Sequence, residues 1–294
     1  MQYLVYLLAY PLIWCISMLP FKLLYFFSDI VYFFVYNIIG YRKKTVRENL
    51  ALALPKLTDN ERLIVEKKFY HHMCDMFLEM IKTMNISKDE ICKRFVFTNI
   101  DMYQEIEKQG KSVAVICSHY ASYEWIISMN YYSDFIAYGI YKQIKNPYFD
   151  KLVHKIRSRF NAKLITTKQT VPTIINNNKN NVLALYGFAS DQSPKAKAAV
   201  HWAKFMGIEV PVHVGAEMLS KRYNMNLLYL NTKKVKRGHY EATLEVLSDN
   251  PKEVPNFELT DQYLKLLEKQ IYEAPEFYLW THKRWKYRRG EESI

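Results

Sequence analysis

Residues 112–118 read SVAVICS, and residues 182–187 read VLALYG. Each run is short, almost continuously apolar and bounded by polar residues, which is typical of a strand buried on both faces of a parallel sheet. Further strand-like runs lie at 93–98, 135–141, 163–167 and 226–231, with an alternating stretch at 239–247. Helical segments are expected between most of them, near 99–109, 122–132, 147–160, 170–178 and 214–223, with another at 260–273. This alternation predicts an α/β fold, in which a mostly parallel central sheet is flanked by helices.

The composition supports a folded protein with an anionic partner. Half of the 294 residues are hydrophobic and 24% are charged, which excludes a disordered chain. The net charge of +12 points to nucleic acid or to an anionic membrane. The four cysteines, which lie far apart without a C-x-x-C pair, argue against a disulfide framework and a structural zinc site: Cys15, Cys74, Cys92 and Cys117.

The N-terminal segment 1–41 is strongly apolar, with Lys22 and Asp29 as its charged residues, and Arg42-Lys43-Lys44 follows it. It is long enough for a membrane span of about 20 residues, but Pro11, Pro20 and Lys22 interrupt it. Three interpretations are open: a spanning anchor, a helical hairpin lying partly in one leaflet, and two core helices of a soluble protein. We favour membrane association, with the basic cluster on the cytoplasmic side. Residues 1–41 are thus predicted to be a membrane-associated helical anchor, and 42–294 a catalytic domain. Beyond the anchor, Thr58 and Glu61 form a predicted capping box for a helix ending near Met84.

A candidate catalytic pair follows the strand at 112–117. His119 lies in the loop after the strand, and Glu124 lies in the first turn of the next predicted helix. Five steps of a continuous helix would separate the two side chains by about 140°, whereas a strand-to-helix corner can bring them together. A histidine oriented by a carboxylate can act as general base, taking a proton from a hydroxyl that attacks a thioester or ester. His-x4-Glu is common by chance, so its place after a buried strand is what gives it weight.

A second polar loop, Ser190-Asp191-Gln192-Ser193-Pro194-Lys195, follows the strand at 182–187. It is either the other wall of the same cleft or a solvated turn. Several basic side chains near the two loops could bind phosphate or could simply be solvated: Arg157, Arg159, Lys195, Lys197 and Lys204. We expect at least one of them to contact phosphate. Candidate substrate-binding residues are therefore Arg157, Arg159, Asp191, Gln192 and Lys195.

Taken together, six motifs resemble those of a known family. They are RKKTVRENLALALP (42–55), SHYASYE (118–124), YKQIKNPYFD (141–150) with the arginines that follow it, SDQSPK (190–195) with VPVHVGA (210–216), and WTHKRWK (280–286). This order is similar to the lysophospholipid acyltransferase superfamily, and within it to the bacterial lipid A late acyltransferases of the lauroyl and myristoyl type. The resemblance extends over essentially the whole chain.

The resemblance implies a membrane-associated acyltransferase that uses no cofactor and no metal. It implies that His119 and Glu124 are the catalytic pair, although many members have Asp at the second position. The donor would be a thioester of acyl carrier protein or acyl-CoA. The acceptor would be a hydroxyl of a membrane glycolipid, such as a lipid A precursor, at the cytoplasmic face of the bacterial inner membrane. Ser193 stands where members often have a second acidic residue, so an aminolipid or a lysophospholipid stays open as the acceptor.

Other hypotheses are weaker. The same fold could carry a non-catalytic lipid-binding protein, or an esterase or thioesterase with Cys117 or a serine as nucleophile, although the sequence has no G-x-S-x-G motif to support the serine. His71, His72 and Cys74 could be taken for metal ligands, but adjacent histidines point about 100° apart on a helix. Residues 283–289 (KRWKYRR) could bind RNA or a membrane surface. The apolar N-terminus favours the membrane, so no nucleic-acid partner is expected.

Overall fold

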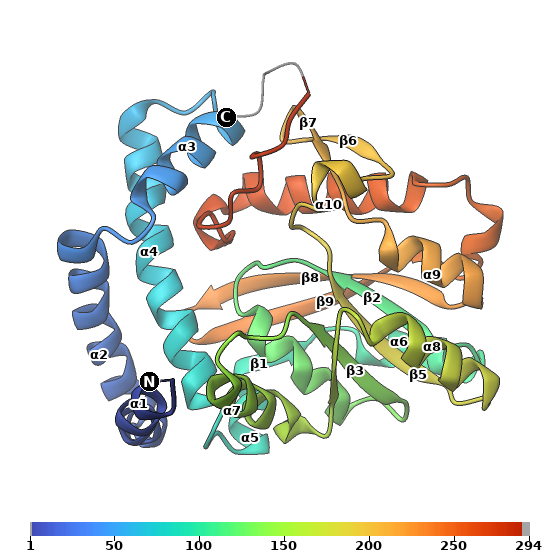
Figure 1. The fold of residues 1–294 in the computed structure, drawn as a ribbon, viewed down its shortest axis with the longest axis horizontal. Helices are drawn as coiled ribbons and strands as arrows, with labels where there is room; N and C mark the ends of the chain where they lie inside the picture. The colour runs from blue at the N-terminus through green and yellow to red at the C-terminus, as the bar shows by residue number, and fades with distance from the viewer. Residues whose placement is uncertain (1, 290–294) are drawn as a thin grey trace.

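The computed structural model describes residues 2–289 and confirms the predicted α/β fold. Its main sheet has seven strands in the order β1-β9-β8-β2-β5-β3-β4, and every neighbouring pair is parallel except β8–β9. The strands are β1 Phe95–Phe97, β2 Val113–Cys117, β3 Ile136–Tyr141, β4 Lys163–Thr166, β5 Ala184–Ala189, β8 Asn226–Lys236 and β9 His239–Ser248. All correspond to predicted runs. The two runs that predicted the fold, β2 and β5, lie side by side near the centre of the sheet (Figure 1).

Helices cover both faces of this sheet. α9 and α10 pack against β8, on the side drawn above the sheet in Figure 1, whereas α5 packs against β1 and β9 on the other side. The helices of this part are α5 Lys88–Arg94, α6 Ile100–Lys108, α7 Pro147–Arg157, α8 Thr170–Lys179, α9 Gly215–Tyr223 and α10 Glu258–Glu273. The predicted helix at 122–132 is a 3-10 helix instead, η2 Tyr123–Tyr131. Its aromatic and β-branched residues are weak α-helix formers, which is consistent with the tighter winding.

A small hairpin of β6 Trp202–Phe205 and β7 Ile208–Pro211 was not predicted. Met206 and Gly207 connect its strands with φ of 54° and 79°. A two-residue connection with two positive φ angles matches the twist of a hairpin.

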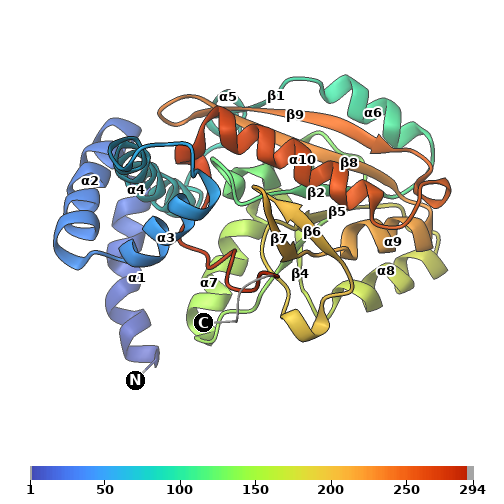
Figure 2. The ribbon, with the colours of Figure 1, turned by 90° about the horizontal axis from the view of Figure 1, so that it is seen from above.

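A long helix, α4 Asp59–Lys82, stands between the sheet and the N-terminal helices (Figure 1). It begins at the predicted capping box: Thr58 Oγ1 accepts a hydrogen bond from the backbone N–H of Glu61, whose carboxylate accepts one from the backbone N–H of Thr58. The elements before it are α1 Gln2–Met18, α2 Phe21–Phe33, a π-helical segment η1 Phe34–Ile39 and α3 Lys43–Ala53. Figure 2 shows α1 and α2 on the outer side of α4, away from the sheet.

Within residues 2–289, one helix is long and apolar enough to cross a membrane, namely the continuous segment Phe21–Ile39 formed by α2 and η1. α1 is apolar but shorter. The apolar N-terminus is thus a candidate membrane anchor, as predicted.

Candidate active site

Two loops meet where β2 and β5 end. Cys117 and Ala189 are register partners, and the backbone N–H of Ser190 donates to the carbonyl of Cys117 at 3.1 Å. His119 and Asp191 each lie two residues beyond the end of their strand. The equal offset brings them face to face, as expected at the carboxyl ends of neighbouring parallel strands.

Asp191 orients the ring of His119. Its Oδ1 lies 2.7 Å from His119 Nδ1 and accepts the backbone N–H of His119 at 3.1 Å. A carboxylate accepts hydrogen bonds only, so Nδ1 carries the proton and Nε2 keeps its lone pair. Gln192 Nε2 lies 3.4 Å from this Nε2, and the ring of Tyr123 meets the imidazole edge to face. The unprotonated nitrogen of a general base therefore lies beside the second loop, where the Gln192 amide can donate to it at 3.4 Å.

Charge controls the protonation of this pair. Burial lowers the pKa of His119, but the carboxylates of Asp191 and Glu124 raise it by more, so the net direction is upward. Burial raises the pKa of Asp191, but the adjacent imidazole brings it below its ordinary value. An ionised Asp191 beside His119 stabilises the imidazolium form, which a general base passes through during proton transfer.

The position of Glu124 differs from the sequence-based expectation. Both of its carboxylate oxygens accept hydrogen bonds from Arg157, Oε2 from Nε at 2.8 Å and Oε1 from Nη2 at 2.6 Å. The imidazole donates its Nδ1 hydrogen bond to Asp191 instead. The corner before η2 has a positive φ of 49° at Ala121, and the carboxylate meets the last turn of α7. Glu124 thus acts on His119 through its charge, and Arg157 holds Glu124 in place.

The C-terminal segment locks the loop of His119. The backbone N–H of Ala121 donates to the carbonyl of Phe277 at 2.9 Å, and the N–H of Leu279 donates to the carbonyl of His119 at 3.1 Å. An isolated antiparallel bridge joins Tyr120 to Tyr278. The backbone around the imidazole is therefore fixed by a segment that lies far away in the sequence.

The prediction that 283–289 forms a membrane-surface patch is wrong for two of its residues. Arg284 and Trp285 are 1% and 2% exposed. Arg284 Nη1 donates to Ser193 Oγ at 2.8 Å, and Ser193 Oγ donates to the backbone carbonyl of Arg284 at 2.6 Å. Trp285 stacks on Phe205 of the small hairpin. These side chains support the loop that carries Asp191. The composition of 283–289 alone predicts a surface segment, but tertiary packing buries these two residues.

The remaining predicted binding residues are not all brought together. Arg159 donates to the carbonyls of Thr83 and Ile86, each at 3.0 Å, and so caps the end of α4. Lys195 is exposed on the second loop, beyond Asp191 and Gln192. Of the predicted substrate-binding set, Asp191 and Gln192 face His119, whereas Arg157 is paired with Glu124.

An apolar cavity beside His119 was not predicted. It is lined by residues of α4, of η2 and of the C-terminal segment: Phe69, His72, Met73, Met76, His119, Tyr123, Phe277 and Leu279. A larger recess on the outer side of α4, lined by Tyr32, Lys67, Lys68, His71, Lys234 and Glu276, shares His72 and Phe277 with it. The spacing of apolar residues along α4 predicts that one face of this helix is buried, but it does not indicate which element packs against that face.

Two other sequence hypotheses find no support here. Burial raises the pKa of the Cys117 thiol to about 12, with the Asp191 charge adding to the effect, so the thiolate needed by a nucleophile is scarce at neutral pH. His71 contacts Asp29, and His72 contacts Lys234. Among residues 2–289, no three His, Cys, Asp or Glu side chains are grouped so that they could hold a metal.

Comparison with known proteins identifies the family of this chain. Residues 1–287 match the family model described as bacterial lipid A biosynthesis acyltransferase. The chain is similar to the lipid A biosynthesis lauroyltransferase of Escherichia coli (strain K12), with 20% identity over 282 residues, covering 96% of this chain and 91% of that protein. The match confirms the resemblance inferred from the motifs and sets aside a non-catalytic lipid-binding protein. The chain belongs to the bacterial lipid A biosynthesis acyltransferase family and is an acyltransferase.

Proposed function

We propose that this protein transfers a fatty acyl chain from the thioester of acyl carrier protein, or of coenzyme A, to a hydroxyl of a lipid A precursor. The reaction would take place at the cytoplasmic face of the bacterial inner membrane, with residues 1–41 as the membrane-associated part and 42–294 as the catalytic domain. The observation that carries the proposal is the 2.7 Å contact between His119 Nδ1 and Asp191 Oδ1, which makes Nε2 the unprotonated nitrogen beside an apolar cavity.

In the proposed step, His119 Nε2 takes the proton of the acceptor hydroxyl as its oxygen attacks the thioester carbonyl. The new C–O bond forms and the C–S bond breaks. The thiolate that leaves receives the proton from the imidazolium, so the imidazole ends the cycle neutral. Asp191 holds the reactive tautomer and stabilises the positive ring, and Glu124 adds a second negative charge nearby. The proton balance requires no further group.

The acyl chain would lie beside the base. Phe69, Met73 and Met76 of α4 line the cavity at His119, which at about 10 Å³ has room for little more than one water molecule. Methionine side chains adapt their shape readily, so these residues would have to move apart to admit a hydrocarbon chain. We propose that the chain enters between α4 and the C-terminal segment. Exposed Lys195 is the proposed contact for a phosphate group of donor or acceptor, since the guanidinium groups of Arg157 and Arg159 are already occupied within the protein.

Mass spectrometry of membrane lipids from cells with and without the gene tests the acceptor. Loss of the gene is expected to leave a lipid A precursor lacking one acyl chain, and a plasmid copy of the wild type should restore it. A His119→Ala copy should not. If the lipid that loses an acyl chain is an aminolipid or a phospholipid while lipid A is unchanged, the lipid A acceptor is contradicted but acyl transfer is not.

Replacing Glu124 by Gln should lower the rate of transfer by roughly 10-fold to 100-fold, less than the loss of His119, because the base itself stays in place. The amide keeps the size of the side chain and removes the charge that adds to the pKa of His119. Arg157→Lys is the matched control, since it keeps the positive charge but loses the two-pronged contact. The test is to measure the single-turnover rates of the purified variants together with their melting temperatures. A loss equal to that of His119→Ala would contradict the auxiliary role.

A further inference from the structure

One face of the N-terminal helices is joined to α4 by a row of polar contacts, which we call the polar seam. The residue numbers rise along the N-terminal helices while those of their partners on α4 fall, so the two segments are antiparallel. In order, the contacts are Ser17 O with Lys82 Nζ at 2.9 Å, Tyr25 Oη with Glu79 Oε1 at 2.9 Å, Ser28 Oγ with Asp75 Oδ1 at 2.8 Å, and Tyr36 Oη with Glu66 Oε1 at 2.9 Å. The seam therefore follows almost the whole of the candidate span Phe21–Ile39.

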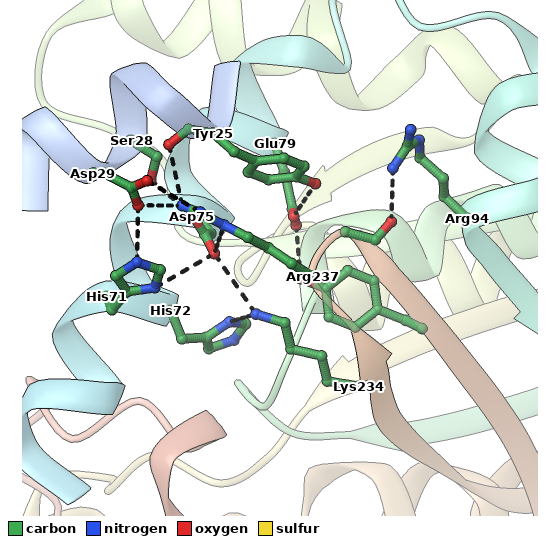
Figure 3. Close-up of polar contacts among 12 residues, drawn as sticks. Tyr25, Ser28, Asp29, His71, His72, Asp75, Glu79, Arg94, Lys234 and Arg237 are labelled. Carbon is green, nitrogen blue, oxygen red and sulfur yellow. Dashed lines mark hydrogen bonds and ion pairs between the residues drawn. The ribbon is translucent and has the colours of Figure 1, made fainter. Parts of the chain in front are cut away.

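Arg237, in the turn between β8 and β9, also contacts the middle of α2 (Figure 3). Arg237 Nη2 lies 2.6 Å from Asp29 Oδ1, 2.7 Å from Asp75 Oδ1 and 3.1 Å from the backbone carbonyl of Tyr25. The next residue, Gly238, has φ +72°, and a Cβ added there would lie 1.8 Å from Tyr25 Oη. The catalytic sheet is thus in direct contact with α2, so the helix is docked and not tethered loosely.

This docking conflicts with a membrane-crossing helix. Asp29, near the midpoint of the candidate span, would lie near the centre of the bilayer together with Arg237. The partner helix α4 carries Lys67, Lys68, Asp75 and other charges along its length, and it would have to enter the hydrocarbon beside α2. Charged groups at that depth are strongly disfavoured. If α2 instead separated from α4 and crossed the membrane alone, the polar side chains of the seam would face lipid or lose their hydrogen-bond partners.

The exposed side chains of the same helices are mostly apolar. We call them the apolar face, which comprises Tyr3, Leu4, Val5, Leu7, Leu8, Leu12, Trp14 and Met18 of α1, Leu23, Phe26, Ile30 and Phe33 of α2, and Phe34, Ile38 and Ile39 of η1. Leu8, Phe26 and Ile39 are 73%, 65% and 68% exposed. Figure 1 shows α2 along its length and α1 end-on at the same edge of the molecule, and Figure 2 shows α1 along its length. Because α1 and α2 cross at a steep angle and both lie on one outer side of the molecule, both can contact the same flat surface.

We propose that α1 and α2 lie in the plane of one leaflet of an anionic membrane, with the apolar face immersed, and that neither helix crosses the bilayer. Exposed Lys22 lies between the α1 and α2 parts of the apolar face, exposed Lys44 follows the face along the chain, and Lys145 is exposed close to α7, which α1 contacts. Such positions suit contact with anionic headgroups. α4 lies between this surface and the cavity of His119, so the reaction takes place about one helix diameter, roughly 10 Å, above the immersed face. The proposal does not depend on the acceptor.

The two ends of Phe21–Ile39 give the test, because a span would place them on opposite sides of the membrane. Single cysteines replace Lys22 and Lys44 in a full-length background with Cys15→Ser and Cys92→Ser. Cys74 and Cys117 are kept, because burial suppresses their ionisation. Intact spheroplasts and inverted inner-membrane vesicles are treated with a membrane-impermeant maleimide. Both cysteines should be labelled in the same preparation, and labelling of the two from opposite sides would overturn the proposal.

A second measurement separates a lipid surface from a second copy of this chain as the occupant of the apolar face. The double variant Phe26→Glu with Ile30→Glu should reduce flotation with phosphatidylglycerol-containing vesicles by at least 10-fold, whereas Val200→Glu, an equally drastic change at an exposed residue elsewhere, should not. Unchanged flotation together with loss of self-association would show that the apolar face pairs with another copy, and would overturn the proposal.

Discussion

Replacing His119 by alanine is expected to lower the rate of acyl transfer by about 100-fold to 10,000-fold, the usual contribution of a positioned general base. The imidazole borders the apolar cavity, and Asp191 holds its Nδ1, so that Nε2 is the nitrogen that can take up a proton. Without it, the acceptor hydroxyl must attack while still protonated. Single-turnover transfer from a labelled acyl thioester, at saturating donor, is the measurement.

Loss of the imidazole also leaves the buried Asp191 carboxylate without its partner, so alanine could act through stability. His119→Asn provides the control, because its amide can still donate to Asp191 but cannot take up a proton at neutral pH. Both variants should be inactive, and the asparagine variant should melt closer to the wild type. Turnover near the wild-type rate in either folded variant would contradict the role of His119.

Replacing Asp191 by Asn is expected to cost about 100-fold to 10,000-fold in kcat/KM, because the amide no longer selects the tautomer with a free Nε2 and no longer stabilises the imidazolium. It should also move the pH profile. A general base must be neutral, so the wild-type rate rises as the pH passes the pKa of His119, which lies above its ordinary value of about 6.5. Without the Asp191 charge, burial dominates, and the pKa of His119 falls.

The acid limb of log kcat/KM against pH should therefore move to lower pH in Asp191→Asn. Glu124→Gln, which removes a smaller contribution to the same pKa, is the matched comparison and should move the limb in the same direction by less. A limb at the wild-type position in Asp191→Asn, with the rate also unchanged, would show that Asp191 does not act through the imidazole.

The local pattern predicted most of the elements. The runs at 112–118 and 182–187 are the central strands, and Thr58 with Glu61 starts α4. These features depend on residues close together in the chain, where side-chain period and capping chemistry act directly. The family followed from six short motifs in order. The unpredicted small hairpin depends on a two-residue turn whose Met206 has a left-handed conformation that its residue type does not favour.

What the sequence determined by itself was therefore the α/β class, the His119 loop at a strand end, and an apolar N-terminus. The tertiary structure alone decided that Asp191, 72 residues away, orients the imidazole, and that Glu124 faces Arg157. It also decided that Arg284 lies in the interior. The physical reason is the same in each case. Strand order and the dihedral angles of the corner at Ala121 set the direction of these side chains, and neither is encoded in the spacing of residues along the chain.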